Sequence, residues 1–251
     1  MQEFKDFITE GVYDKHIFKA FFLAGGPGSG KSWVAARTLE GSGLKLINTD
    51  LGLENYARKV GLELKMTAMS DFQTRQKDFL RKRSKKGTES QLAHAIDGRL
   101  GLILDSTARD VPRIEREMRA LQVIGYDTYM VFVNTTIEVA LKRNQLRPRA
   151  LPDHMVISSH KQVQANKAQL KNIFGSGNYE EVDNNYDLKY INNQVYKAIN
   201  KHKKKKYSKQ KAKDWYDNEI AMKKATGAAA TKKKGFLCLL YTSPSPRDEV
   251  L

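Results

Sequence analysis

Gly25-Gly26-Pro27-Gly28-Ser29-Gly30-Lys31-Ser32 is the stretch that decides the fold of this chain. Its glycines, lysine and serine occupy every fixed position of the G-x-x-x-x-G-K-[ST] phosphate-binding loop. Residues 18–24 before it are apolar and aromatic, which is typical of a buried strand, and residues 32–40 after it are typical of a helix. Strand, glycine loop and helix in this order predict a binding site for a nucleoside triphosphate.

Each residue type in the loop has a physical role in that prediction. Glycines reach backbone angles closed to other residues, so consecutive N–H groups can turn inward around a phosphate. Lys31 would add a mobile positive charge for the outer phosphates, and the Ser32 hydroxyl would ligate Mg²⁺. The alternative is a glycine turn that only joins a strand to a helix, which the complete motif disfavours. The expected ATP-binding residues are Gly25, Gly26, Gly28, Ser29, Gly30, Lys31 and Ser32.

Length and charge indicate one α/β domain with a basic appendage. The 251 residues carry a formal charge of +16, but the charge is spread unevenly. Residues 1–185 hold 28 Lys+Arg against 22 Asp+Glu, whereas residues 186–251 hold 16 against 6. The excess of +10 in the second part, against +6 in the first, predicts a basic tail. Such a tail could contact nucleic acid without sequence specificity or serve only as a solubilising extension.

Targeting signals and cysteine usage favour a reducing, cytoplasmic setting. No apolar run approaches the length of a membrane span, and the first ten residues carry too many charges for a secretory leader. Cys238 is the only cysteine, so no disulfide framework and no cysteine metal site are expected.

Two carboxylates follow predicted strands downstream of the loop. Residues 43–50 form a likely second strand that ends in Asp50, and residues 100–107 form another that contains Asp105. Because ligands gather at the carboxyl ends of parallel strands, both side chains should face the crevice of the phosphate loop. Asp105 would lie in or near the Mg²⁺ shell. For Asp50 a functional role competes with a role as helix N-cap, since Asp is favoured there.

Arginines and prolines after the fourth predicted strand, residues 128–134, suggest a lid. Arg143, Arg147 and Arg149 flank two prolines between predicted helices. Phosphoryl transfer needs cations over the developing charge, and a lid that carries arginines supplies them while excluding water. The alternative is an ordinary exposed loop. A long helix over 154–174 and an edge strand over 178–185 then complete a parallel five-stranded sheet with helices on both faces, so the P-loop domain should span 16–185.

Four further segments carry weaker signals. Residues 1–15 read as a leader in which an amphipathic helix competes with a cleavable segment that ends Ile8-Thr9-Glu10-Gly11. The basic run 81–86 is either a solvated helix end or a contact for an anionic substrate. Residues 186–237 form the basic helical or disordered tail. Residues 238–251 resemble a translated sequencing adaptor and are excluded from the argument.

Together these motifs resemble the small P-loop kinases of the polynucleotide kinase and zeta-toxin group, including versions from T-even-type phages. The resemblance covers about residues 16–185 and rests on Lys31, Ser32, Asp50, Asp105 and the lid pattern Arg143-Asn144-x-x-Arg147 with Pro152 and Val156. It implies transfer of the γ-phosphoryl of ATP, with Mg²⁺, to a nucleotide, polynucleotide or sugar nucleotide. It also implies that Asp50 deprotonates the acceptor hydroxyl. A phage origin would place the protein in the infected host cell, or packaged in the capsid if residues 1–15 are a leader.

The sequence departs from that group at one informative position. Polynucleotide kinases often carry an arginine three residues after the base, where this chain has Leu53. Other function classes remain as alternatives. A GTPase is disfavoured because no Asn-Lys-x-Asp run occurs. A P-loop ATPase and a nucleic-acid-binding phage protein without kinase activity stay open.

Overall fold

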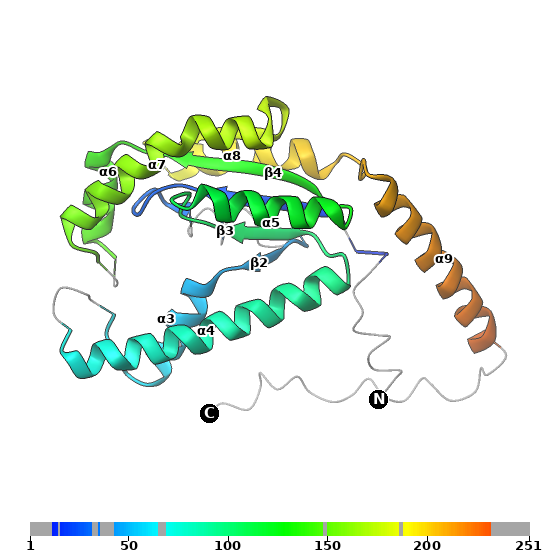
Figure 1. Ribbon diagram of the computed structural model, residues 1–251, viewed down its shortest axis with the longest axis horizontal. Helices are drawn as coiled ribbons and strands as arrows, with labels where there is room; N and C mark the ends of the chain where they lie inside the picture. Colours follow the sequence, from blue (N-terminus) through cyan, green and yellow to red (C-terminus); the bar gives the residue numbers. More distant parts are fainter. Residues whose placement is uncertain are drawn as a thin grey trace. The chain divides into compact units, whose positions relative to one another are not determined.

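A parallel sheet of five strands lies at the centre of the structure, a computed structural model (Figure 1). The strand order is β2-β3-β1-β4-β5, and every neighbouring pair is parallel. The strands are β1 (Lys19–Ala24), β2 (Lys45–Ile47), β3 (Leu102–Asp105), β4 (Asp127–Asn134) and β5 (Tyr179–Asp183). The residues described are 12–14, 16–31, 35, 43–64, 69–147, 150–185 and 188–231. The arrangement confirms the predicted α/β fold of P-loop NTPases.

The central strands are buried on both faces, as their apolar sequences predict. Every residue of β1 is buried, and so are all residues of β4 except Asn134 at its end. Phe21 on β1 is directly opposite Tyr129 on β4, and the two rings stack with centroids 5.2 Å apart. Near-continuous apolar strands are expected where helices cover both faces of a parallel sheet.

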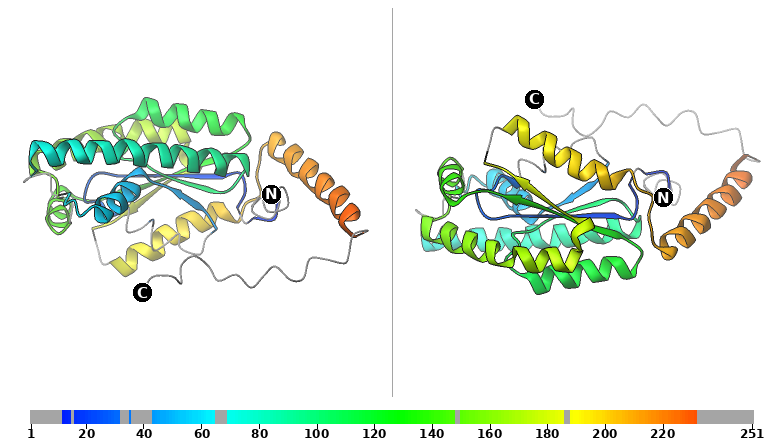
Figure 2. Two further views of the ribbon diagram at one scale, coloured as in Figure 1. Left: turned by 90° about the horizontal axis from the view of Figure 1, so that it is seen from below. Right: turned by 90° about the horizontal axis from the view of Figure 1, so that it is seen from above.

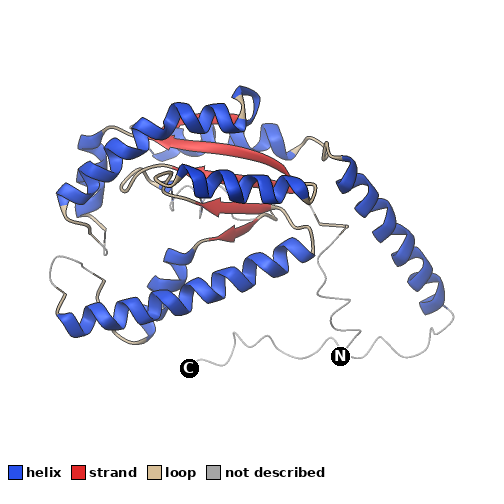
Figure 3. Cartoon of the chain, in the orientation of Figure 1, coloured by secondary structure: helices blue, strands red, loops and turns tan. Residues whose placement is uncertain are grey.

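Helices cover both faces of this sheet (Figures 2 and 3). One face carries α4, α5 and α7, and the other carries α8. The helix that opens the crossover to β4 is capped by Asp110, because Asp110 Oδ1 accepts from the backbone N–H of Arg113 at 3.0 Å. The helices after β3 are α5 (Val111–Val123), α6 (Ile137–Gln145), α7 (Asp153–Phe174), the short 3₁₀ turn η2 (Ser176–Asn178), α8 (Leu188–Lys203) and α9 (Gln210–Thr231).

A helical hairpin is inserted between β2 and β3. It consists of α3 (Thr49–Lys59) and α4 (Asp71–Asp97), and a reciprocal capping box between Ser70 and Gln73 starts α4. Leu53 and Leu80 belong to a small core of its own. The basic run 81–86 lies in the middle of α4, not at a helix end, and its residues are exposed apart from Ser84.

The chain after β5 continues the packed structure. Ile199 on α8 is only 2% exposed and belongs to the same core cluster as Phe21 and Ile103. The first compact unit therefore runs on to Ala212, and the second begins at Lys213. In the described part of the chain, no helix is long and apolar enough to cross a membrane. The predicted leader cleavage site, Ser32, Arg149 and residues 238–251 lie outside the described residues.

Candidate active site

The phosphate loop follows β1 and packs tightly against its surroundings. Gly28 and Gly30 have φ angles of +76° and +87°, a region that side-chain-bearing residues rarely adopt. A Cβ at Gly28 would collide with the backbone of Ala140 on α6, and one at Gly30 would collide with Asn184. The glycines are therefore required by both backbone angle and space, and the loop keeps the narrow cradle that the sequence predicts.

Lys31 is folded back onto this cradle. Its Nζ donates to the carbonyl oxygens of Gly25 at 2.7 Å and Gly26 at 3.4 Å, and the residue is 9% exposed. Burial lowers the pKa of Lys31, while the charge of Asp105 acts in the opposite direction. A buried amine held only by carbonyl oxygens can exchange them for phosphate oxygens, which are stronger partners because they are charged.

Asp105 ends β3 beside the loop. Its Oδ2 accepts from Asn48 Nδ2 at 2.7 Å, whereas its Oδ1 is buried and has no hydrogen-bond partner among the described residues. Burial raises the pKa of Asp105, and the positive charge of Lys31 partly offsets this shift. Buried polar atoms are usually satisfied, so this oxygen is available to accept from a water or a ligand or to bind an ion.

Asp50 lies in the first turn of α3 and is not its N-cap. Asn48 caps the helix, because its Oδ1 accepts from the backbone N–H groups of Asp50 at 2.8 Å and Leu51 at 3.4 Å. The alternative interpretation of Asp50 as the helix cap is therefore wrong. The charge of Asp50 acts on the pKa values of both Lys31 and Asp105, so the three groups share one electrostatic environment.

Two lid arginines are described, and they occupy different places. Arg147 acts electrostatically on both Lys31 and Asp105, so its charge lies near theirs. Arg143 instead donates through Nη1 to the carbonyl oxygen of Asn184 at 2.8 Å and is partly buried, which lowers the pKa of its guanidinium. It therefore faces the phosphate loop from the side of β5.

Asn144 fixes the base of the lid. This side chain is 1% exposed, and its amide donates to Leu151 O at 2.7 Å while accepting from Leu151 N at 3.0 Å. The pair of bonds imitates a strand pairing and ties both ends of the segment 145–150 together. A cavity of about 530 Å³ opens here, lined by Asn144, Gln145, Ala150, Leu151, Pro152, Asp153 and His154.

Sequence reasoning missed Asn184, which braces the loop from β5. It is 1% exposed, its Nδ2 donates to the carbonyl oxygen of Ser29, and its own carbonyl accepts from Arg143. Asn48, which holds Asp105, was also missed. Both asparagines directly follow a strand, so the signal that could have found them was a polar residue at the carboxyl end of a parallel strand.

We expect Asn184→Ala to weaken ATP binding about tenfold, or about 1.4 kcal/mol, because it leaves the buried Ser29 carbonyl without its donor. Titration calorimetry with ATP measures this change. Asn178→Ala is the matched control, since Asn178 is exposed and donates only to Phe174 O at 3.3 Å. Equal ATP affinity in the two variants would show that the Asn184 brace does not position the loop.

The sequence of residues 21–173 matches the AAA domain family, and the chain belongs to it. Comparison with curated proteins finds no match. Among solved structures, a gluconokinase from Sinorhizobium meliloti 1021 is 16% identical, with 75% of this chain and 95% of that chain covered and a TM-score of 0.44. A chain of the Pnkp1/Rnl/Hen1 RNA repair complex is 21% identical, with 61% of this chain and 46% of that chain covered and a TM-score of 0.46. A chain of the AvrRxo1-ORF1:-ORF2 complex with ATP is 18% identical, with 66% of this chain and 54% of that chain covered and a TM-score of 0.48. These distant similarities carry no argument about activity.

Proposed function

We propose that the chain is a P-loop kinase that transfers the γ-phosphoryl of ATP to a hydroxyl on a nucleotide, polynucleotide or sugar nucleotide. One observation carries the proposal. Asn48 joins the two carboxylates, because its Nδ2 donates to Asp105 Oδ2 at 2.7 Å and its Oδ1 accepts from the backbone N–H of Asp50 at 2.8 Å. The charges of Asp50 and Arg147 both act on Lys31 and Asp105. A loop that served only for binding would need Asp105 for the metal but not the second carboxylate, Asp50.

Each of these residues would have a different role in phosphoryl transfer. Lys31 would leave the loop carbonyls and contact the outer phosphates, and Arg147 would neutralise charge that develops on the transferred group. Asp50 would orient the acceptor hydroxyl and take its proton. The lid, pinned at Asn144, would close over the site and exclude water.

The residues present also fit ATP with Mg²⁺. Asp105 Oδ1 is a buried carboxylate oxygen without a hydrogen-bond partner among the described residues, and Mg²⁺ prefers oxygen ligands from one or two side chains together with phosphates. No cluster of three metal-ligating side chains occurs among the described residues. Asp105 and Ser32 would hold the ion. When bound, Mg²⁺ neutralises phosphate charge and aligns the outer phosphates.

The acceptor site differs from that of the polynucleotide kinases that the sequence resembles. Leu53, at the position where those enzymes often have arginine, is 0% exposed and packs in the hairpin core with Ala57 and Leu80. An acceptor phosphate cannot be bound from that position. Exposed basic side chains on α4, such as Arg81 and Lys85, are the available replacements.

A transfer assay with γ-labelled ATP and Mg²⁺ tests the proposal. The acceptor panel would contain 5′-hydroxyl DNA and RNA, nucleosides, nucleoside monophosphates and sugar nucleotides. We expect label on one acceptor class with the wild type and none with Lys31→Ala. Label found only as free phosphate across the whole panel would identify an ATPase instead. ATP binding without release or transfer of phosphate would favour a nucleic-acid-binding protein.

A further inference from the structure

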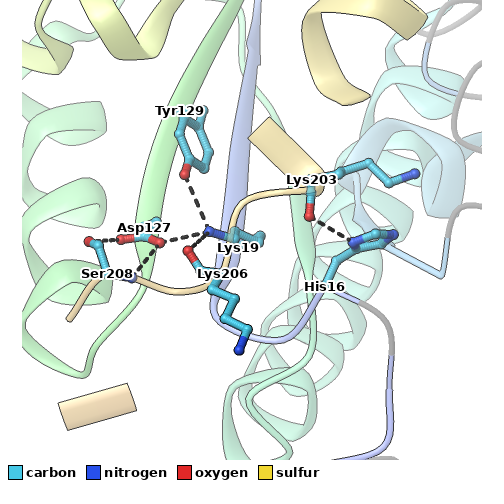
Figure 4. A network of polar contacts seen from close by, with 7 residues as sticks. All are labelled: His16, Lys19, Asp127, Tyr129, Lys203, Lys206 and Ser208. Carbon is cyan, nitrogen blue, oxygen red and sulfur yellow. Dashed lines mark hydrogen bonds and ion pairs between the residues drawn. The ribbon is translucent and has the colours of Figure 1, made fainter. Parts of the chain in front are cut away.

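A polar network holds the end of α8 and the segment after it against the amino ends of β1 and β4 (Figure 4). We call residues 201–211 the basic strap. Lys19 Nζ, at the start of β1, donates to Asp127 Oδ2 at 2.7 Å and to the carbonyl oxygen of Lys206 at 3.1 Å. Ser208 donates to the same Asp127 carboxylate through its backbone N–H at 3.0 Å and its hydroxyl at 2.5 Å. The strap therefore has a fixed backbone, because its anchors are buried.

The start of the strap is anchored as firmly. His202 is 0% exposed, stacks on Tyr129 with centroids 4.2 Å apart, and lies 3.1 Å from Glu180 Oε1 through Nε2. The Nδ1 of His16 donates to the carbonyl oxygen of Lys203 at 3.2 Å. These contacts use backbone atoms and buried rings, so they leave the exposed side chains of Lys204, Lys205, Lys206 and Lys209 at the surface.

The strap concentrates positive charge that is mostly not neutralised. Residues 196–212 contain eight lysines and no Asp or Glu. Lys201 is paired with Glu180 at 2.6 Å. In the described part of the chain, no ion pair involves the exposed lysines Lys204, Lys205, Lys206 and Lys209. The positive charge of Lys205 acts to lower the pKa values of two buried residues, Lys19 and His202.

A cavity of about 230 Å³ lies among these lysines. Its wall includes Lys205, Lys206 and Lys209 together with the neutral hydrogen-bonding side chains of Gln122, Thr128 and Asn178. The acidic member of the wall, Asp127, is already neutralised by Lys19. A cavity lined by lysines and by neutral hydrogen-bonding side chains fits an anionic group with polar substituents, such as a sugar-phosphate unit.

This surface is separate from the candidate active site. The strap lies at the amino ends of β1 and β4, whereas the phosphate loop follows the carboxyl end of β1. The six residues of β1 span about 20 Å, at roughly 3.3 Å per residue. A ligand on the strap therefore does not occupy the ATP site.

We propose that the basic strap binds the phosphate backbone of nucleic acid, without base specificity and without ATP. Ordered lysines that neutralise phosphates release condensed counterions, which drives such binding. An anionic membrane fits less well, because the strap presents no apolar anchor. Tyr207, its only large apolar side chain, packs edge-on against Phe18 with centroids 5.9 Å apart. The kinase proposal is independent of this one.

Fluorescence anisotropy with the full chain and a labelled, 5′-phosphorylated single strand of about 20 nucleotides tests the proposal. The measurement is made with EDTA and without ATP, so that failure of the kinase proposal does not affect it. The test variant changes Lys204, Lys205, Lys206 and Lys209 to Gln. We expect its dissociation constant to rise about 10- to 100-fold at 0.15 M salt and its log–log salt slope to fall in magnitude by about 3.

A control variant with the same change in charge separates the strap from general electrostatics. It changes four exposed basic residues on other helices, Lys59, Arg116, Lys161 and Lys171, to Gln. We expect this variant to bind nearly as tightly as the wild type. Equal weakening in the two variants would overturn the proposal, as would full affinity in the strap variant. Binding to phosphatidylserine vesicles in place of the oligonucleotide would overturn it in favour of a membrane contact.

Discussion

Asp50→Asn should lower the rate of phosphoryl transfer by about 10²- to 10⁴-fold and leave the affinity for ATP nearly unchanged. The side chain keeps its size, and the cap of α3 is unaffected because Asn48 provides it. The capacity to take a proton is lost together with the negative charge of Asp50. Single-turnover transfer to the acceptor identified in the panel measures the rate, and calorimetry measures ATP binding.

Glu54→Gln is the matched control for this variant. Glu54 lies one turn further along α3 and does not act on the pKa of Lys31 or Asp105. We expect it to retain the wild-type rate. If Asp50→Asn turned over at the wild-type rate as well, Asp50 would have no part in proton transfer and would serve only to bias the local charge.

The fold was predictable because it depends on local patterns. A complete phosphate-loop motif names the strand before it and the helix after it, and buried parallel strands appear as continuous apolar runs such as residues 128–134. Asp50 and Asp105 were found by the same logic, since each follows or ends such a run. The charges of both carboxylates act on the pKa of Lys31, and their roles in the reaction stay predictions.

The remaining features depend on tertiary contacts that leave no local pattern. Asn184 contacts Ser29 across 155 positions of sequence, and no periodicity links the two. The burial of Ile199 was not predicted either. The lysines that follow Ile199 indicated a tail, although α8 places this apolar side chain in the core of the domain. Arg143 and Arg147 look equivalent in the sequence, yet one contacts the carbonyl of Asn184 and the other acts on Lys31.

The second large effect concerns Asp105, where function and stability should change in opposite directions. We expect Asp105→Asn to reduce transfer about 100-fold, because an amide is a poorer partner for the magnesium shell than a carboxylate. We also expect the variant to unfold at a higher denaturant concentration than the wild type near neutral pH. Burial raises the pKa of Asp105, so the folded protein holds a carboxylate in a place that disfavours its charge.

The dependence on pH gives this prediction its sign. The unfolded carboxyl ionises near its ordinary value of 3.8, and the folded one ionises at higher pH. Between these two pKa values the folded state binds more protons, so the stability of the wild type falls as pH rises through this window. Asn does not titrate. The stability advantage of Asp105→Asn should therefore be small below pH 3.8, grow as pH rises between the two pKa values, and level off above the pKa of the folded carboxyl.

Urea unfolding of both proteins across this pH range measures the advantage, and Asp97→Asn, which changes an exposed carboxylate at the end of α4, is the control. Mg²⁺ with ATP should remove the advantage, because the ligand binds the ionised wild type and stabilises it by mass action. A constant difference at all pH values would mean that Asp105 is satisfied in the folded protein without a ligand. Loss of the difference only when Mg²⁺ and ATP are both present would tie the strain at Asp105 to the binding of the metal nucleotide.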